Sequence, residues 1–242
     1  MDLKNEDFTQ HKHISQQFNT ELLELKNHFL VMGGLVEQQV SDAVRALMNG
    51  DSGVAEEVRL RDREVDKLEM TIDEECVQVI ARRQPAARDL RLVVSVAKMV
   101  NDLERIGDEA KKIAKIAINL AEEGQPPRGY VEVRHIANHV AQMVHQALNC
   151  FARLDAEMAV EIMREDYSVD SEYKSAMRSL VTFMMEDPRS ISRILSVMWV
   201  LRALERIGDH ARNLAEHVIY MVKGKDVRHT PMEKVEATVA GD

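Results

Sequence analysis

The chain has 242 residues, of which 30% are charged and 45% hydrophobic, so it has enough apolar side chains to bury a core. Aromatic residues make up only 4%, and glycine (10) and proline (5) are scarce, although a strand-rich protein needs turn residues at roughly every tenth position. The net charge of −9 argues against a general nucleic-acid binder, because phosphate neutralisation needs clustered Lys and Arg. We therefore expect an all-α protein, rich in helix-forming residues, that binds no nucleic acid.

Neither membrane insertion nor a disulfide framework is expected. The polar N-terminal stretch "MDLKNEDFTQHKH" contains no apolar signal region, and no run approaches the roughly 18 apolar residues that a membrane helix needs. Cys76 and Cys150 lie in apolar helical patterns, so two buried thiols are the simplest interpretation. A cytoplasmic location is expected.

The apolar periodicity predicts six helices. Pro85 and Pro188 mark the break before the third and the sixth helix, and a linker separates the third from the fourth. In chain order the helices are expected at 15–49, 52–83, 86–122, 130–153, 155–185 and 189–223. The stretch "EEGQPPRG" at 122–129 holds two of the five prolines and two of the ten glycines, so residues 123–129 are predicted to link two halves. Periodicity is lost after Lys225, and residues 225–242 are expected to form a flexible tail.

An internal repeat organises the chain. "ERIGD" occurs at 104–108 and again at 205–209, an offset of 101, and the apolar seam of the surrounding helix repeats with it. Upstream the offset is 104, where "DREVD" at 62–66 matches "DYSVD" at 166–170. The fold expected is two tandem three-helix bundles, one over residues 1–122 and one over residues 130–224.

Acidic side chains of neighbouring helices are expected to converge in each half. If Leu103 and Ile106 face the core, Glu104 and Asp108 lie away from it, one turn apart on the same face. The antiparallel helix before them carries "DREVD", whose acids border its buried face. Two surface patches follow from this reading: Asp62, Asp66, Glu104 and Asp108 in the first half, and Asp166, Asp170, Glu205 and Asp209 in the second.

Neither the closely spaced acids nor the glycines of the pentads favour folding. Like charges four residues apart destabilise a helix by about 0.2–0.5 kcal/mol, and a glycine in mid-helix, as at Gly107 and Gly208, costs about 1 kcal/mol relative to Ala. The simplest alternative, that these acids are solvated charges with no function, therefore explains the pattern less well than a binding site does. Carboxylates without thiols suit hard cations such as Mg, Ca, Mn or iron, and glycine would allow close approach of a ligand. Glu69 and Asp73 continue the acidic stripe that Asp62 and Asp66 begin in the first half. The second site is expected to bind a cation less well, because these two acids align there with Tyr173 and Met177.

The basic residues beside the pentad acids have two open interpretations. Arg105 and Arg206 are expected to pair with Asp108 and Asp209, three residues on, or else to hold an anion. His210 aligns with Glu109 in the other repeat, so we expect it to be incidental.

At these residues the sequence resembles the PhoU family. The stretches that carry the resemblance are "DREVD", "RRQPAARDLRLV", "NDLERIGDEA", "DYSVD" and "ALERIGDHARN", and it extends over about residues 10–224. It implies a cytoplasmic negative regulator of the phosphate-starvation response, not an enzyme, and commonly a homodimer. The implied partners are the ATPase subunit of the phosphate-specific ABC transporter (PstB type) and a sensor histidine kinase (PhoR type).

The resemblance also implies multinuclear metal sites, with divalent ions or iron as the cofactor. Carried over by position, the ligands are Asp62, Asp66, Glu104 and Asp108 in one site and Asp166, Asp170, Glu205 and Asp209 in the other.

Two other functions remain as alternatives. A carboxylate-metal oxidase of the ferritin type needs two Glu-x-x-His motifs facing a helical core, and only Glu132-x-x-His135 is found, without a counterpart in the repeat. A metal-binding helical scaffold with no signalling role would show the same acidic patches.

Overall fold

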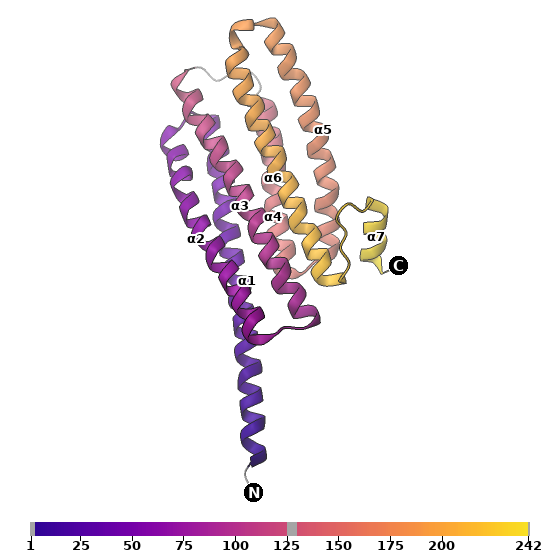
Figure 1. Ribbon diagram of the computed structural model, residues 1–242. Helices are drawn as coiled ribbons and strands as arrows, with labels where there is room; N and C mark the ends of the chain where they lie inside the picture. Colours follow the sequence, from indigo (N-terminus) through magenta and orange to yellow (C-terminus); the bar gives the residue numbers. More distant parts are fainter. Residues whose placement is uncertain (1–2, 125–129, 242) are drawn as a thin grey trace.

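The computed structural model describes residues 3–124 and 130–241 (Figure 1). In the described residues it consists of helices and connecting turns, which confirms the expected all-α class. The α-helices are α1 (Leu3–Asn49), α2 (Ser52–Arg83), α3 (Ala87–Glu122), α4 (Tyr130–Arg153), α5 (Ala156–Glu186), α6 (Ile191–Lys223) and α7 (Met232–Ala240), with a short 3₁₀ helix, η1 (Pro188–Ser190), before α6.

Local signals in the sequence set the helix ends, and they repeat in both halves. The side chain of Asp51 caps α2 by accepting a hydrogen bond from the Val54 amide, and Asp155 caps α5 from the equivalent position of the repeat. Gln84, which precedes Pro85, ends α2 in the left-handed conformation, and Gly224 ends α6 in the same way.

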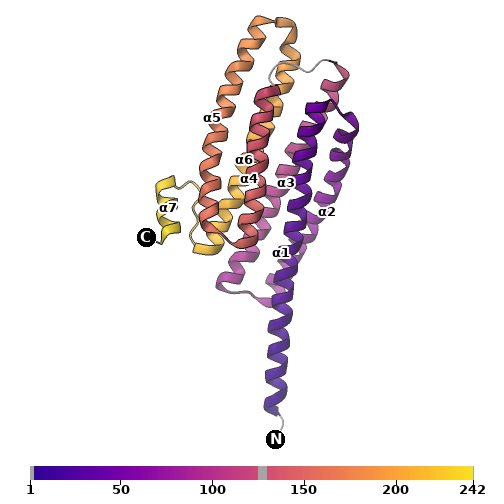
Figure 2. The same cartoon turned by 180° about the vertical axis from the view of Figure 1, so that it is seen from behind.

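The two three-helix bundles lie side by side and share one core. In Figure 1, α2, α3, α6 and α5 form the front layer, and Figure 2 shows α1 and α4 side by side behind them. The seam of α3 predicted from the sequence is buried, as at Leu103 and Ile106, and so is the corresponding seam of α6. Phe29 of α1 meets Phe151 of α4 with ring centroids 4.4 Å apart, so the apolar contact continues from one bundle into the other.

Both cysteines are buried, as expected. The thiol of Cys76 hydrogen-bonds the Val93 carbonyl and that of Cys150 the Asp155 carbonyl. Burial raises the pKa of each thiol to about 12, which keeps both thiols neutral. No helix in the described ranges is long and apolar enough to cross a membrane.

The ends of the chain differ from the expectation. Helix α1 begins at Leu3 instead of residue 15 and extends past the other helices in Figure 1. Part of the predicted linker, 125–129, lies outside the described residues. The predicted flexible tail instead contains α7, with Val227 and Val235 buried and Glu236 bound to Arg164 of α5. The prediction failed because α7 is short and buries only Val235, a pattern too brief to give a helical period.

Candidate functional site

The first acidic cluster, Asp62, Asp66, Glu104 and Asp108, lies where α2 faces α3. The pKa of Glu104 is raised, by burial first and then by the neighbouring charge of Asp108, with Glu69 and Asp66 of α2 adding to the repulsion. The pKa of Glu69 is raised as well, by burial and then by Asp73 and Asp66. The convergence of the α2 and α3 acids predicted from the sequence is therefore present.

A lysine neutralises the innermost member of this cluster. Lys111 of α3 donates a hydrogen bond to the Asp62 carboxylate, and the two form an ion pair. That hydrogen bond is the main cause of the raised pKa of Lys111, and Asp108 and Asp66 also contribute. Asp62 is only 4% exposed, so the amine lies over a carboxylate that has little contact with water.

The second acidic cluster, Asp166, Asp170, Glu205 and Asp209, occupies the same place between α5 and α6. The pKa of Asp209 is raised, first by desolvation and then by Asp170, although its side chain still reaches solvent. The pKa of Glu205 is raised by burial and then by Asp209. Arg212 donates a hydrogen bond of 3.0 Å to Asp166, which is 5% exposed.

The paired cation is part of the repeat, and sequence reasoning missed it. Asp62 and Asp166 correspond at the offset of 104, and Lys111 and Arg212 correspond at the offset of 101. At the next position the same offset aligns Lys112 with Asn213, so the positive charge recurs only at Lys111 and Arg212. The recurrence of a positive charge at Lys111 and Arg212 was the signal that could have found the pair.

The expectation that these acids form surface patches is wrong for three of them. Asp62, Asp166 and Glu205 are 4%, 5% and 8% exposed, because they lie on helix flanks that close against a neighbouring helix. The role expected of the glycines also changes. A Cβ atom on Gly107 would stand 3.1 Å from Oε1 of the buried Gln39, so this glycine makes room for a core side chain. At Gly208 a Cβ atom would make ordinary contacts, the nearest 3.6 Å from Val169.

The clusters fit a hard cation by chemistry more than by arrangement. Every donor is a carboxylate oxygen, and Oε2 of Glu205 is buried without a hydrogen-bond partner, which is unusual for a charged group. Within residues 3–124 and 130–241, however, no group of three or more His, Cys, Asp or Glu side chains is arranged to hold a metal ion. Lys111, Arg202 and Arg212 already contact carboxylates of the two clusters, so cation binding requires these side chains to move.

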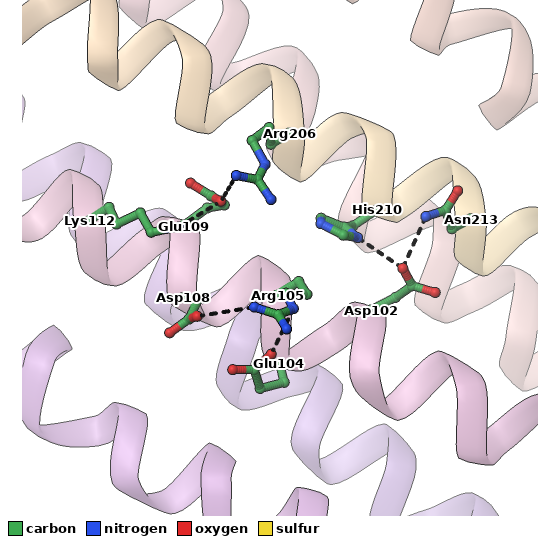
Figure 3. Close-up of polar contacts among 9 residues, drawn as sticks. All are labelled: Asp102, Glu104, Arg105, Asp108, Glu109, Lys112, Arg206, His210 and Asn213. Atoms are coloured by element: carbon green, nitrogen blue, oxygen red, sulfur yellow. Dashed lines mark hydrogen bonds and ion pairs between the residues drawn. The ribbon is translucent and has the colours of Figure 1, made fainter.

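A polar seam joins α3 to α6 between the two clusters (Figure 3). Nδ1 of His210 lies 2.8 Å from Oδ1 of Asp102, and the Asn213 amide donates to the same oxygen at 3.0 Å. His210, expected to be incidental, therefore binds the first bundle to the second. Asp102 and His210 flank the two pentads, on α3 and on α6 respectively.

The two arginines of the pentads behave differently. Arg105 lies 3.4 Å from Glu104 and 3.9 Å from Asp108, which includes the partner predicted for it. Arg206 pairs instead with the buried Glu109 of the other bundle, at 3.1 Å, and this replaces the partner predicted in its own helix (Figure 3).

The Glu-x-x-His motif does not face a helical core. Glu132 and His135 line a surface pocket of about 270 Å³ with Glu172 of α5, and His135 lies 3.4 Å from Glu172. His135 is largely exposed, so the arrangement differs from the buried one that a ferritin-type oxidase uses.

Comparison with known proteins gives one family over most of the chain. The model of the PhoU domain matches residues 29–117 and 133–218, one copy in each bundle. The chain is 62% identical over 229 residues to the phosphate-specific transport system accessory protein PhoU homolog of Pseudomonas putida, covering 95% of this chain and 90% of that protein. It is 45% identical over 230 residues to the Escherichia coli K12 protein named phosphate-specific transport system accessory protein PhoU, covering 95% of each.

Two solved structures share the fold. The crystal structure of PhoU from Pseudomonas aeruginosa superposes with a TM-score of 0.84 at 60% identity, covering 86% of this chain and all of that one. The phosphate transport system regulatory protein PhoU from Streptococcus pneumoniae superposes with a TM-score of 0.80 at 28% identity, covering 87% and 99%.

Proposed function

The chain belongs to the PhoU family, and we propose that it is an accessory regulator of phosphate uptake that keeps the phosphate-starvation response switched off when phosphate is plentiful. The observation that carries the proposal is the extent of the match: relatives named as phosphate-specific transport accessory proteins align over 95% of this chain. The shared architecture extends over both bundles, which supports the same kind of role for this chain.

The proposed mechanism is binding without a chemical step. The ATPase subunit of the phosphate-specific ABC transporter (PstB type) and a sensor histidine kinase (PhoR type) are the proposed partners, and the protein would link them in the cytoplasm, as a homodimer. Large apolar side chains on the outer face of α6 support a role in association: Trp199 is 67% exposed and Leu195 44%. Occupancy of these surfaces, set by binding equilibria, would carry the signal.

The two acidic clusters are the proposed regulatory elements. When a hard cation is bound, the residues that would hold it are Asp62, Asp66, Glu104 and Asp108 in one cluster and Asp166, Asp170, Glu205 and Asp209 in the other. A bound cation supplies positive charge that offsets the repulsion among these carboxylates. Lys111 and Arg212 supply that charge in the cation-free protein, so they would compete with the cation.

The experiment that tests this function is a reporter assay. Alkaline phosphatase activity is measured in phosphate-replete cells that lack the gene, and again after the gene is restored. We expect high activity without the gene and low activity with it. Activity that stays equally low in both would contradict a role as negative regulator.

Two isosteric variants then test the clusters. The first removes four charges, at Glu104, Asp108, Glu205 and Asp209, by E104Q, D108N, E205Q and D209N. The control removes four exposed charges on α2 and α5, by E57Q, E64Q, E157Q and E161Q. We expect the first variant to fold, shown by circular dichroism, yet to fail in silencing phosphatase, while the control silences it. If both silence it equally, the protein is better described as a scaffold whose acidic clusters carry no signal.

A further inference from the structure

The segment after α6 folds back over the junction of α3 and α6 and closes a small pocket there. Figure 1 shows this segment leaving the lower end of α6 and leading to α7 beside α5. The pocket has a volume of about 210 Å³, which suits an ion or a very small molecule. Its lining comes from α3, α6 and the returning segment: Lys98, Glu216, His217, Tyr220, Asp226 and Arg228.

Three of the lining side chains have donor groups that no other residue uses. Across the described ranges, Lys98 and Tyr220 form no hydrogen bond or ion pair. His217 is only 8% exposed, and its nearest acid, Asp102, lies 3.9 Å from Nε2, beyond hydrogen-bond range. Its nitrogens are not among the fully buried polar atoms that lack a partner, so the imidazole can donate from the pocket wall to a bound ligand.

Each of the two acids of the pocket is bound by an arginine, although Arg212 is shared with Asp166. Asp226 is bound by Nε and Nη2 of Arg228 at 2.6–3.1 Å, and Glu216 accepts from Nε of Arg212 at 3.2 Å. Lys98 itself forms no ion pair within the described ranges, and its charge lowers the pKa of Asp226 only as a weaker addition to Arg228. Donor groups without partners, one of them the ammonium of Lys98, favour an anion over a cation as the ligand.

We propose that this pocket binds a phosphate-type oxyanion, held by the ammonium of Lys98 and by hydrogen bonds from Tyr220 and His217. The carboxylate of Glu216 should make the pocket bind phosphate more tightly than sulfate. Phosphate at neutral pH keeps a hydroxyl that can donate to a carboxylate, whereas sulfate has no proton to donate. The proposal stands apart from the regulatory function proposed above and from the acidic clusters.

The phosphate group has two chemically equivalent sources. A second pocket of about 460 Å³ adjoins the first, since both are lined by Glu216 and Arg228, and Arg206, Arg212 and His229 also line it. A free phosphate ion needs only the small pocket. A larger organic phosphate, such as a nucleotide, would place one phosphate there and extend into the larger pocket.

The test is isothermal titration calorimetry on the full-length protein at low ionic strength, with inorganic phosphate, sulfate and ATP as separate titrants. We expect saturable binding of inorganic phosphate at one site per chain, and weaker binding of sulfate. Lys98→Met should weaken phosphate binding about tenfold or more, because it removes a charge-assisted contact. The matched control is Lys115→Met, an exposed and unpaired lysine on the same helix, about 25 Å away along its axis.

Each outcome decides. Tighter binding of ATP than of phosphate, lost in Lys98→Met, supports the pocket with an organic phosphate as its ligand. Absence of saturable heat with every titrant up to about 10 mM would overturn the proposal. So would equal affinities for the Lys98→Met and Lys115→Met variants, because binding would then be located elsewhere. Arg228→Met provides a second variant, expected to weaken binding through loss of the partner that neutralises Asp226.

Discussion

The two acidic clusters share one plan but differ in how deeply it is buried. In the first, the amine of Lys111 covers Asp62, and the Lys111 side chain is 43% exposed. In the second, Arg212 is 25% exposed, bonds both Asp166 and Glu216, and stacks 5.5 Å above the ring of Tyr167. Both copies of the repeat therefore keep a buried carboxylate with a basic partner. In the second copy that partner is less exposed to solvent and makes more contacts.

The difference reverses the ranking that the sequence favours. Loss of acids at Tyr173 and Met177 predicts a poorer second site. The structure instead leaves an unpartnered, buried carboxylate oxygen on Glu205, in the second cluster. A group of this kind is costly without a ligand, so the second cluster is the one with more to gain from a bound cation.

The largest expected effect comes from removing the cation of each cluster. Arg212→Met strands the buried carboxylate of Asp166 and should lower the free energy of unfolding by about 3 kcal/mol. Lys111→Met should cost roughly half as much, because the more exposed Lys111 contributes less packing and water can replace it more easily. Urea unfolding followed by circular dichroism measures both. Equal losses would show that the two clusters are energetically alike.

The next largest effect is the dependence of stability on pH, which comes from the carboxyl groups in and near the two clusters. Burial raises the pKa of six carboxyl groups, Glu69, Asp73 and Glu104 near the first cluster and Asp166, Glu205 and Asp209 in the second. Between their ordinary values of 3.8 for Asp and 4.5 for Glu and their raised values, the folded state binds more protons than the unfolded state. The stability from these groups is therefore present at low pH and is lost as the pH rises through the raised values.

Other groups oppose this trend, so the comparison needs a variant. The pKa of Asp226 is lowered to about 2 by Arg228, and that of His217 is lowered by burial, so both favour the folded state less as the pH falls. The double variant E205Q/D209N should gain less stability than the wild type as the pH falls from 7.5 toward the ordinary values of these two groups, 4.5 and 3.8. Identical slopes for the two proteins would show that these carboxyl groups do not titrate in that window.

How far the sequence predicts the molecule depends on the range of the interaction. The pentads, the apolar seam and the prolines predict both bundles, because these are local or periodic features. The clusters of α2 with α3 and of α5 with α6 were also predictable, since antiparallel neighbours bring fixed faces together. The burial of Asp62 was not, because it depends on how closely α2 packs against its neighbours in the first bundle. The contact of His210 with Asp102 was not either, because it depends on how the two halves are oriented against each other.

The polar seam between the halves should contribute a smaller effect. His210→Ala removes one of the two hydrogen bonds to Asp102, whose side chain is 14% exposed, and should cost about 1 kcal/mol. His145→Ala is the matched control, because His145 also joins the halves, through Glu37, but is 59% exposed. We expect it to cost less than about 0.5 kcal/mol. If the control costs as much as His210→Ala, burial of the seam does not determine its strength.

The smallest effect is a gain in stability, and it bears most directly on the proposed role of the second cluster. Glu205→Gln replaces a buried, partly unpaired carboxylate, repelled by Asp209 and Asp170, by a neutral amide whose oxygen can still accept from Arg202. It should stabilise the cation-free protein by about 0.5–1 kcal/mol. Glu104→Gln should gain less, because Glu104 is more exposed. With Mn²⁺ present, the wild type should instead be more stable than Glu205→Gln, because the variant lacks a ligand and gains less stability from the ion. Thermal unfolding with and without Mn²⁺ measures both signs. A carboxylate that destabilises the empty protein yet is needed for the gain from Mn²⁺ is retained for binding, whereas one whose removal stabilises the protein equally in both conditions has no part in a cation site.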